Sequence, residues 1–497
     1  MAPKSFPRVA SFRTARSVGE YLAGLGYHLP CDEDIQKAPS SPLAQPLEIP
    51  WRTGHFTIGN RFAVQPMEGW DGEVDGHPSD LTRRRWLRFA QGGAKLIWGC
   101  EAVAVLPEAR ANPNQLVLNE QTAGAFETLL QEMRKAHEER FGSNSDLLIG
   151  LQLTHSGRFS RPHEKGRLEP IIAYHHPILD PKLRIPSCHS PVSETEIERI
   201  VRAFGRAARL ARDTGFDFVD LKHCHGYLGH EFLSAYTRSG SYGGDFENRT
   251  RFLKETVAAT RDSAKGIEIG VRLSAFDSVP FAEEPASGTA IPVIEPGLLP
   301  YTWGFGLDPA EPWKPDLSEA KLVISLLTAM GVKLVNVSAS SPYYAPHLQR
   351  PALFPPSDGY PPPEDPLVGA ARLVLAARDL KHTGNGVVVV SSGWTYFQNF
   401  LPHFAQAAVR EHWTDLVGLG RMMLSYPDLP ADALQKGRMD PKRLCRTFSD
   451  CTTGPRNGLI SGCYPLDNFY KGRPEAARLQ SIKEELRRDR RADSVPT

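Results

Sequence analysis

Eight short β-prone runs alternate with helical patterns along the chain, and this alternation restricts the fold more than any other feature. Most of the runs are continuously apolar, as strands covered on both faces are. They are Phe62–Pro66, Leu96–Val103, Leu147–Leu153, Phe218–Lys222, Glu268–Ser274, Leu334–Ser338, Val387–Ser391 and Leu416–Gly420. Eight strand–helix alternations within about 400 residues predict an α/β fold, the (β/α)8 TIM barrel.

The segments between the runs carry helix signals. Ser193-Glu-Thr-Glu196 is a capping-box sequence that opens an amphipathic segment, and Gly215 is expected to end it. Ser318 is expected to cap a helix over Glu319–Met330. Glu120–Arg140 and Asn399–His412 show similar periodicity. The alternative, an open doubly wound sheet, is less favoured because no Gly-x-Gly-x-x-Gly follows the first run.

Segments outside this alternation define the domain limits. We expect an N-terminal extension over residues 1–45, a barrel over 46–440 and a C-terminal tail over 441–497. Two connections are long, Ser278–Pro315 after the fifth run and Ser340–Pro366 after the sixth, and the second carries Tyr343 and Tyr344. Loops of this length are usually lids or linkers. Because both follow strand ends, we expect lids that shape a pocket.

Composition narrows the class of partner. The 497 residues have a formal charge of +1, which disfavours binding to nucleic acid or to a membrane surface. No apolar run approaches the roughly 18 residues of a membrane span. The basic segment Met1–Arg16 lacks an apolar signal core, so we expect a solvated arm, with a transit peptide as the alternative. Seven scattered cysteines indicate a reducing compartment, and a cytoplasmic location is expected. A homo-oligomer is compatible with the sequence.

Polar residues follow the fourth run, inside the stretch 216–234. Lys222, His223, His225 and Tyr227 stand together where a buried strand should end. In parallel α/β proteins, strand C-termini are where ligands bind. This cluster is therefore predicted to form the active site, and the alternative is a hydrogen-bonded surface turn. Other strand ends supply Gln65-Pro-Met-Glu68, Glu101-Ala102, Gln152-Leu-Thr-His155-Ser-Gly-Arg158, Arg272, Ser391-Ser-Gly393 and Gly420-Arg421.

The last two strand ends predict a phosphate site. Gly393 and Gly420 would let the backbone approach a ligand closely, and Arg421 would neutralise a dianion. Barrels commonly bind phosphate after their seventh and eighth strands. A Gly-Arg pair alone usually marks a helix-entry turn, so the prediction rests on both strand ends together.

Several separate motifs resemble those of the old yellow enzyme family of FMN-dependent oxidoreductases, in the family's order and spacing. They cover most of residues 50–435. They are Asn60-Arg-Phe-Ala-Val-Gln-Pro-Met67, Gly150-Leu-Gln-Leu-Thr-His-Ser-Gly-Arg158, Gly226-Tyr-Leu228 with Glu231-Phe-Leu-Ser234, Tyr242-Gly-Gly-Asp-Phe-Glu-Asn-Arg249 and Asp415-Leu-Val-Gly-Leu-Gly-Arg421.

The resemblance implies a TIM barrel with FMN at its mouth. Gln152 would hydrogen-bond the pyrimidine edge of the flavin, and Arg272 would lie near N1 and O2. His225 would bind a substrate oxygen, and Tyr227 would protonate the neighbouring carbon. The alternative for Gln152 is a polar residue at a strand end whose hydrogen bonds are made within the protein. The alternative for Tyr227 is an aromatic residue that only caps a turn. The remaining cofactor contacts would come from Pro66, Met67, Ala102, Gly393, Gly420 and Arg421.

Two residues depart from the family pattern beside the flavin. Lys222 holds the first position of the usual substrate-binding pair, where the family has His. His223 is displaced by one residue and would point to the other face of the strand. Glu68 stands where the family tends to have Thr or Cys near the flavin. The alternative is that Glu68 is a solvent-exposed acid in a loop, without contact to the flavin. We expect either that Lys222 selects anionic substrates or that it forms an ion pair with Glu68 that fills the pocket.

The tail departs as well. Larger relatives such as 2,4-dienoyl-CoA reductase carry a four-cysteine iron–sulfur site after the barrel. Cys445, Cys451 and Cys463 keep three of those positions, but Phe448 replaces the fourth. Four thiolates normally hold such a cluster, so we expect no metal here. Gly304-Phe-Gly306 and Gly418-Leu-Gly420 lack the third glycine of a dinucleotide fingerprint.

These observations predict an FMN-dependent ene-reductase. NADH or NADPH would act as a diffusible donor, and the substrate would be an α,β-unsaturated carbonyl or carboxyl compound. One alternative is an FMN-dependent dehydrogenase or demethylase that oxidises a C–H or C–N bond. The other is a flavin-binding barrel without catalytic activity.

Overall fold

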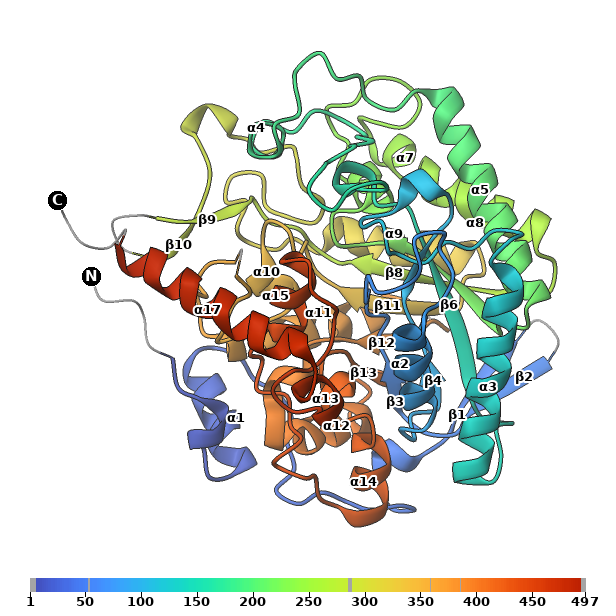
Figure 1. The fold of residues 1–497 in the computed structure, drawn as a ribbon, viewed down its shortest axis with the longest axis vertical. Helices are drawn as coiled ribbons and strands as arrows, with labels where there is room; N and C mark the ends of the chain where they lie inside the picture. Colours follow the sequence, from blue (N-terminus) through green and yellow to red (C-terminus); the bar gives the residue numbers. More distant parts are fainter. Residues whose placement is uncertain (1–5, 52–53, 285–287, 358, 385, 493–497) are drawn as a thin grey trace.

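A closed barrel of parallel strands forms the centre of the protein (Figure 1). In this computed structural model, the described residues are 6–51, 54–284, 288–357, 359–384 and 386–492. The strand order is β4-β3-β13-β12-β11-β8-β7-β6-β5, and β4 and β5 both pair with β6. Because β4 and β5 are two pieces of the second predicted strand, the sheet closes with eight strand positions. The predicted (β/α)8 fold is confirmed.

The barrel strands follow the apolar runs closely, and the fifth and sixth predicted strands, β8 and β11, are confirmed residue for residue. The exception is the predicted strand Leu96–Val103, which is broken in the middle. Cys100 there has φ +53°, a left-handed conformation that interrupts extended backbone. The strands are β3 (Phe62–Val64), β4 (Leu96–Ile97), β5 (Ala102–Ala104), β6 (Leu148–Thr154), β7 (Phe218–His223), β8 (Glu268–Ser274), β11 (Leu334–Ser338), β12 (Val388–Ser391) and β13 (Leu416–Leu419).

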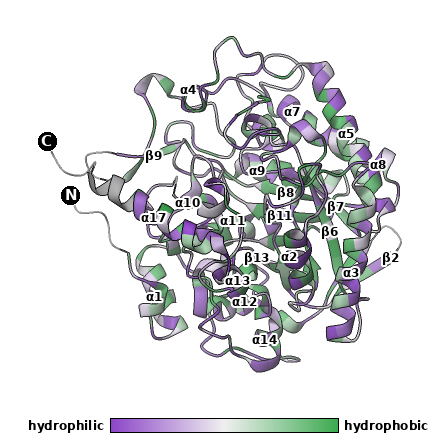
Figure 2. Cartoon of the chain, in the orientation of Figure 1, coloured by the Kyte–Doolittle hydropathy of each residue, from purple (hydrophilic) through white to green (hydrophobic). Residues whose placement is uncertain are grey.

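Amphipathic helices surround the barrel. Figure 2 shows apolar residues concentrated on the central strands and hydrophilic residues on the outer helices. The helix α5 begins as predicted, with the Ser193 side chain accepting from the Glu196 N–H. Ser318 is not a cap, which corrects the prediction, because it is the first helical residue of α9 and donates to Asp316 instead. The principal helices are α2 (Asp80–Ala90), α3 (Ala123–Phe141), α5 (Glu194–Asp213), α8 (Arg251–Ser263), α9 (Ser318–Ala329), α11 (Pro366–Lys381) and α12 (Leu401–Arg410).

Shorter elements occupy the two ends of the barrel. The β1–β2 hairpin packs its Ile49 and Ile58 beneath the barrel core, beside Trp98 and Phe218. None of the helices in the described ranges is long and apolar enough to span a membrane. The shorter elements are β1 (Leu47–Trp51), β2 (Gly54–Ile58), β9 (Phe281–Glu283), β10 (Ala290–Pro292), α4 (Leu179–Leu183), α6 (Leu228–Leu233), α7 (Phe246–Arg249), α10 (Pro346–Gln349), α13 (Met422–Ser425), α14 (Leu429–Lys436), α15 (Asp450–Arg456) and α16 (Asn468–Lys471).

Both terminal segments pack on the barrel. In the extension, α1 (Ala15–Gly24) buries Val18 and Leu22 in the main core, and the Tyr21 hydroxyl donates to Asp365 at the start of α11. In the tail, α15 contributes to the mouth of the barrel, and α17 (Pro474–Ala492) packs against it, with Lys483 bonded to Asp450. The helices α1 and α17 lie on the left of Figure 1.

Candidate active site

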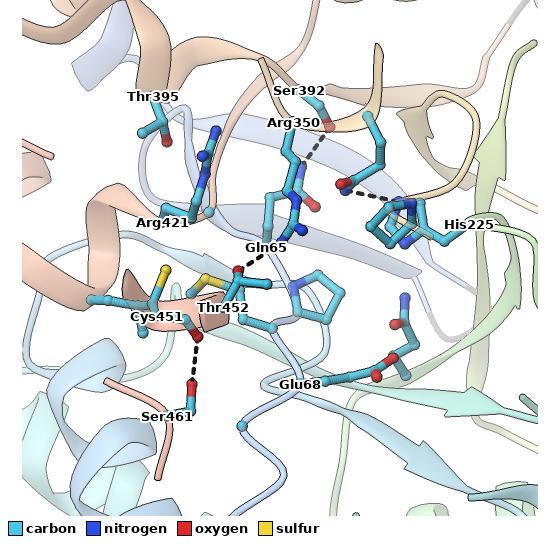
Figure 3. A pocket seen from close by; sticks show the side chains of 18 of the residues that line it. Gln65, Glu68, His225, Arg350, Ser392, Thr395, Arg421, Cys451, Thr452 and Ser461 are labelled. Atoms are coloured by element: carbon cyan, nitrogen blue, oxygen red, sulfur yellow. Dashed lines mark hydrogen bonds between the residues drawn. The ribbon is translucent and has the colours of Figure 1, made fainter. Parts of the chain in front are cut away.

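A cavity opens at the C-terminal ends of the barrel strands, and Figure 3 shows it from close by. Two sets of residues face each other across it. One set, which we call the Glu68 wall, consists of Glu68, Lys222, His225 and Tyr227. The other, the Arg421 wall, consists of Gly393, Thr395, Gly420 and Arg421. Between them the lining includes Gln65, Pro66, Met67, Trp70, Gln152, Arg272, Tyr343, Gln349 and Arg350.

Glu68 is the centre of its wall because three donors from different elements bond its carboxylate. Lys222 Nζ, at the end of β7, lies 2.5 Å from Oε1. The Tyr227 hydroxyl donates to Oε2 at 2.7 Å, and Trp70 Nε1 donates to the same oxygen at 3.0 Å. Lys222 Nζ also lies 3.8 Å from the centre of the Tyr227 ring, within cation–π range. In its ion pair with Lys222, the Glu68 carboxylate accepts hydrogen bonds from all three donors.

A glycine fixes the loop that carries Glu68. The Gly69 N–H donates to Glu101 Oε2 at 2.9 Å, and Glu101 is held in turn by Arg85. A Cβ at Gly69 would lie 2.1 Å from Arg85 Nη2, so the loop can pass this buried ion pair only with glycine here. Trp70 follows with φ +52°. This left-handed residue turns the indole back towards Glu68, at a modest cost in backbone strain.

Tyr227 is buried but contacts a second tyrosine that is closer to solvent. Only 2% of Tyr227 is exposed, and burial together with Glu68 raises its pKa well above the ordinary value. Its hydroxyl oxygen lies 3.0 Å from that of Tyr343, a half-buried residue in the connection after β11. The Tyr343 ring stacks on Phe159 with centroids 4.1 Å apart, which fixes its position. These contacts bring a general-acid candidate and a second phenol to one side of the cavity.

His225 follows β7 in a strained conformation. Its φ is +66°, and Gly226 continues the left-handed turn with φ +76°. Non-glycine residues in this region tend to mark functional sites. The ring Nε2 lies 2.8 Å from Ser338 Oγ and 3.3 Å from Gln349 Nε2. Burial lowers the pKa of His225 well below its usual value, and Arg272 and Lys222 add to the effect. The imidazole is therefore neutral and can offer a hydrogen bond but no charge.

Asp220 holds the two residues predicted to contact the flavin ring. It is buried inside the barrel on β7, where it accepts from the Gln152 side chain, the Arg272 N–H at 2.6 Å and Trp98 Nε1 at 2.7 Å. Burial raises the pKa of Asp220 to about 6, so the group is mostly ionised at neutral pH. The Arg272 guanidinium extends to the Pro66 carbonyl, with Nη1 and oxygen 3.5 Å apart. Gln152 on β6 and Arg272 on β8 are thereby held on either side of β7.

The Arg421 wall consists of the ends of β12 and β13. Arg421 Nη2 donates to the Pro351 carbonyl at 2.8 Å, which aims the guanidinium along the cavity. Its Nη1 is buried and has no hydrogen-bond partner among the described residues. Gly393 adopts φ +97°, and a Cβ there would approach the Ala370 carbonyl to 3.0 Å. An added Cβ at Gly420 would meet nothing nearer than Gln65 Cβ at 4.0 Å, so the space above this glycine is open.

Most of the predicted site residues lie together around this cavity. Ala102 is not among the residues that line the cavity: it is buried on β5 beside its register partner Gln152, and its contact with the flavin stays a prediction. His223 points out of the barrel towards Phe252 on α8, as strand alternation predicts. The predicted ion pair between Lys222 and Glu68 is present. The described part of connection 278–315 does not reach the cavity, because it packs in a cluster of its own around Phe281 and Tyr301.

The connection Ser340–Pro366 was predicted to be a lid, and residues from it line the cavity, whereas no role was predicted for the tail residues that join them. Tyr343, Gln349 and Arg350 come from the connection after β11, where the pair Tyr343-Tyr344 was the available signal. The tail contributes more, because Cys451, Thr452, Pro455, Arg456 and Ser461 also line the cavity. Arg350 Nη1 donates to Thr452 Oγ1 at 2.7 Å, which joins the two segments (Figure 3).

The tail cysteines gather near this end of the cavity. Cys445 and Cys463 are buried, and Cys451 faces the lining. Burial raises the pKa of all three thiols, which keeps them protonated. Within the described ranges, no group of three or more Cys, His, Asp or Glu residues is arranged to hold a metal ion. The absence of an iron–sulfur cluster stays a prediction, which iron and acid-labile sulfide assays on anaerobically purified protein would test.

Comparison with known proteins gives a consistent set of relatives. The model of the NADH:flavin oxidoreductase / NADH oxidase family matches residues 43–286. An NADPH dehydrogenase of Bacillus velezensis is 33% identical over 240 residues, which cover 47% of this chain and 65% of that protein. A probable N-methylproline demethylase of Rhizobium meliloti is 30% identical over 270 residues, 53% of this chain and 37% of that protein. The chain thus spans less than two thirds of either relative.

Solved structures agree on the architecture. The old yellow enzyme homologue from Zymomonas mobilis superimposes with a TM-score of 0.53, over 80% of this chain and 94% of that one. Its sequence identity of 20% makes this a statement about the fold alone.

Proposed function

Because the chain belongs to the old yellow enzyme family, the NADH:flavin oxidoreductases and NADH oxidases, we propose that it is an FMN-dependent ene-reductase. NADH or NADPH is the electron donor, and the substrate is an α,β-unsaturated carbonyl or carboxyl compound. The observation that carries this proposal is the buried hydroxyl of Tyr227 at the cavity, beside a neutral His225 and opposite a guanidinium-bearing wall.

The lining of the cavity fits FMN. Arg272 Nε and Arg421 Nη1 are buried donors without a hydrogen-bond partner among the described residues. Buried polar groups are rarely left unpaired, so these two point to an absent acceptor. The open space over Gly420 suits a phosphate that approaches the backbone closely. Gln152 and Arg272 would hold the pyrimidine ring, Pro66 and Met67 would line the flavin, and Gly393, Gly420 and Arg421 would hold the phosphate.

The residues of the Glu68 wall then have separate tasks. FMN, when bound, supplies hydride transfer from the nicotinamide to the substrate. His225 donates a hydrogen bond to the carbonyl oxygen of the substrate, where negative charge develops. Once its hydroxyl turns from Glu68 to the substrate, Tyr227 gives its proton to the carbon next to that carbonyl. An acid of high pKa can do this only when the carbon is strongly basic. Lys222 holds Glu68 and places a positive charge beside the Tyr227 ring, which stabilises the phenolate left behind.

The ion pair bears on the choice of substrate. A free Lys222 would favour substrates whose oxygen is already anionic. Since Glu68 balances its charge at 2.5 Å, we propose that Lys222 acts through Glu68 and Tyr227 and does not select anionic substrates. Neutral enones and unsaturated acids are then expected to bind according to shape and to their hydrogen bond with His225.

The test is an anaerobic assay of the purified protein. We expect one FMN per chain, released by denaturation, and bleaching of the flavin absorbance by NADH or NADPH. A panel of enones and unsaturated acids should restore the absorbance, with the saturated compound as the product. A protein that retains no flavin, or a reduced flavin that no activated alkene reoxidises, would contradict the proposal.

One observation favours a second function, the oxidation of a C–H or C–N bond. The Tyr227 hydroxyl points at the Glu68 carboxylate, so Tyr227 could lose its proton to Glu68 and act as a base. The similarity to a probable N-methylproline demethylase makes amines the substrates to test. Secondary or tertiary amines should bleach the flavin without nicotinamide if this function is correct. Ene-reduction predicts no bleaching by amines.

A further inference from the structure

Tyr227 is almost completely buried at the inner end of the cavity, which raises the question of how it would regain a proton after each reaction. It is 2% exposed and lies beneath the connection after β11. Among the described residues, its hydroxyl oxygen has two hydrogen-bond neighbours, Glu68 Oε2 at 2.7 Å and the Tyr343 hydroxyl at 3.0 Å. A proton that returns to Tyr227 by hydrogen-bonded transfer must therefore pass through one of these two groups.

The hydrogen bonds have a defined direction. In its ion pair with Lys222 the Glu68 carboxylate accepts hydrogen bonds, and the one hydroxyl proton of Tyr227 is donated to it. The contact between the two phenols then requires Tyr343 to be the donor. The Tyr343 proton already lies between the two oxygens. Glu68, by contrast, would first have to be protonated, at the expense of its ion pair with Lys222.

Tyr343 is placed to exchange protons with solvent. It is half-buried at the mouth of the cavity, while Tyr227 is fully enclosed. Stacking on Phe159 at 4.1 Å holds its ring, and the Arg456 guanidinium lies 5.8 Å from the ring centre. Burial and the Glu68 carboxylate raise the pKa of Tyr343, and the positive charge of Arg456 opposes this shift.

We propose that Tyr343 is a proton-relay residue that restores Tyr227 after each turnover, an inference that rests on the proposed role of Tyr227 as the acid. When the Tyr227 O–H bond breaks, a C–H bond forms on the substrate. The Tyr343 O–H bond then breaks as that of Tyr227 re-forms, and Tyr343 takes a proton from water or a buffer acid. No electrons move in these steps, and each phenol ends as it began. Between turnovers, Glu68 holds the Tyr227 hydroxyl proton, so Tyr343 is the donor in the contact between the two phenols.

The first test compares single and multiple turnovers of the FMN-loaded Tyr343→Phe variant. Tyr227 keeps its own proton, so reoxidation of prereduced enzyme by one equivalent of enone should proceed at the parent rate. Steady-state turnover should slow at least about tenfold, as the loss of a positioned proton donor predicts. Small buffer acids such as imidazolium should restore it in proportion to their concentration. Tyr344→Phe is the control, because the neighbouring hydroxyl donates to Asp277 and not to Tyr227.

If single-turnover reoxidation and steady-state turnover slowed equally and buffer acids restored neither, the relay would be overturned and Tyr343 would have a packing role. Unchanged steady-state turnover would overturn it as well. If the parent protein reduces no alkene, the proposed function fails, and a second measurement decides the relay independently of activity.

That second measurement replaces Tyr227 by 3,5-difluorotyrosine, whose phenol is more acidic, and follows its ionisation by ¹⁹F NMR in the FMN-loaded protein. Tyr343→Phe removes a donor to the phenolate and should raise the pKa of residue 227 by about one to two units. Glu68→Gln removes a neighbouring negative charge and should lower it. An unchanged pKa in the Tyr343→Phe variant would show that Tyr343 donates no hydrogen bond, and the relay would be overturned.

Discussion

The two walls of the cavity differ in how their charges are balanced. In the Glu68 wall, the one cation, Lys222, is bonded to a carboxylate. In the Arg421 wall, Arg421 bonds a neutral carbonyl and keeps a buried N–H without a partner in the described part of the chain. The two walls also come from different halves of the amino-acid sequence. The first lies within residues 43–286, which the family model matches, and the second lies beyond them.

This difference assigns different chemistry to each wall. A balanced set of donors and acceptors can move a proton without changing the net charge of the site, which suits general acid catalysis. An unbalanced guanidinium next to open backbone suits a permanent anion such as a phosphate. The account therefore predicts that changes in the first wall alter rates, while changes in the second alter cofactor binding.

The largest effect is expected for Tyr227→Phe in the Glu68 wall. Reoxidation of the flavin by an alkene should slow by about 10²–10⁴, the usual contribution of a general acid, while reduction by nicotinamide stays near normal. Stopped-flow measurement of each half-reaction checks this. Tyr242→Phe is a matched control, because its hydroxyl donates to Glu255 at 2.7 Å, away from the cavity. Equal slowing of both half-reactions would instead point to a packing role.

A smaller effect is expected for replacement of Arg272 or Arg421, and the two variants should differ in the rate of flavin reduction. Arg272→Ala and Arg421→Ala should each weaken FMN binding by about 1.5–3 kcal/mol, the value of a charge-assisted hydrogen bond. Arg272→Ala should also slow flavin reduction, whereas the FMN retained by Arg421→Ala should be reduced at the parent rate. Fluorescence titration of the apoprotein and stopped-flow reduction measure the two quantities.

Arg410→Ala serves as the control for these variants, because Arg410 pairs with Asp32 on the outside of the barrel. An Arg272→Ala variant that stays yellow and is reduced at the parent rate would refute the cofactor assignment. A rate defect in Arg421→Ala would remove the distinction between the walls.

The smallest effect is expected for Lys222→His on substrate preference. Because Glu68 already balances the charge of Lys222, the ratio of rates on carboxylate-bearing and neutral alkenes should change little. A free lysine that bound anionic substrates would instead shift this ratio by the roughly 1.5–3 kcal/mol of a charge-assisted contact. Steady-state rates on one matched pair of substrates measure the ratio, and a shift of that size would restore anion selection as the role of Lys222.

The barrel could be predicted because its strands are buried on both faces and therefore apolar throughout. The exact match over Glu268–Ser274 and Leu334–Ser338 follows from this. The second strand was predicted as one piece because nothing in Leu96–Val103 signals the left-handed turn at Cys100. That turn depends on tertiary packing, since a Cβ at Gly99 would lie 2.8 Å from Gln152 Cβ.

The site was predictable only where its residues follow strands directly. His225 and Tyr227 follow β7, and Lys222 and Arg272 lie in the last residues of β7 and β8, so all four are at the same end of the barrel. Tyr343 lies on the connection Ser340–Pro366, which its place after a strand end indicated as a lid. Thr452 lies in the tail, whose path depends on packing against distant segments, so no local pattern could place it over the cavity. The strand membership of Ala102 was predicted as well, but the break at Cys100 that separates β5 from β4 was not.

The central claim is that Tyr227 completes the reduction of an activated alkene at a bound flavin. The most direct measurement mixes anaerobically reduced, FMN-loaded protein in D₂O with one equivalent of an enone and analyses the product by NMR. We expect full reoxidation of the flavin and one solvent deuterium at the carbon next to the carbonyl. In Tyr227→Phe, the amount of deuterated product formed at the earliest time after mixing should be greatly reduced. Reoxidation by oxygen but by no alkene, or deuterium incorporation at the same rate in Tyr227→Phe, would contradict it.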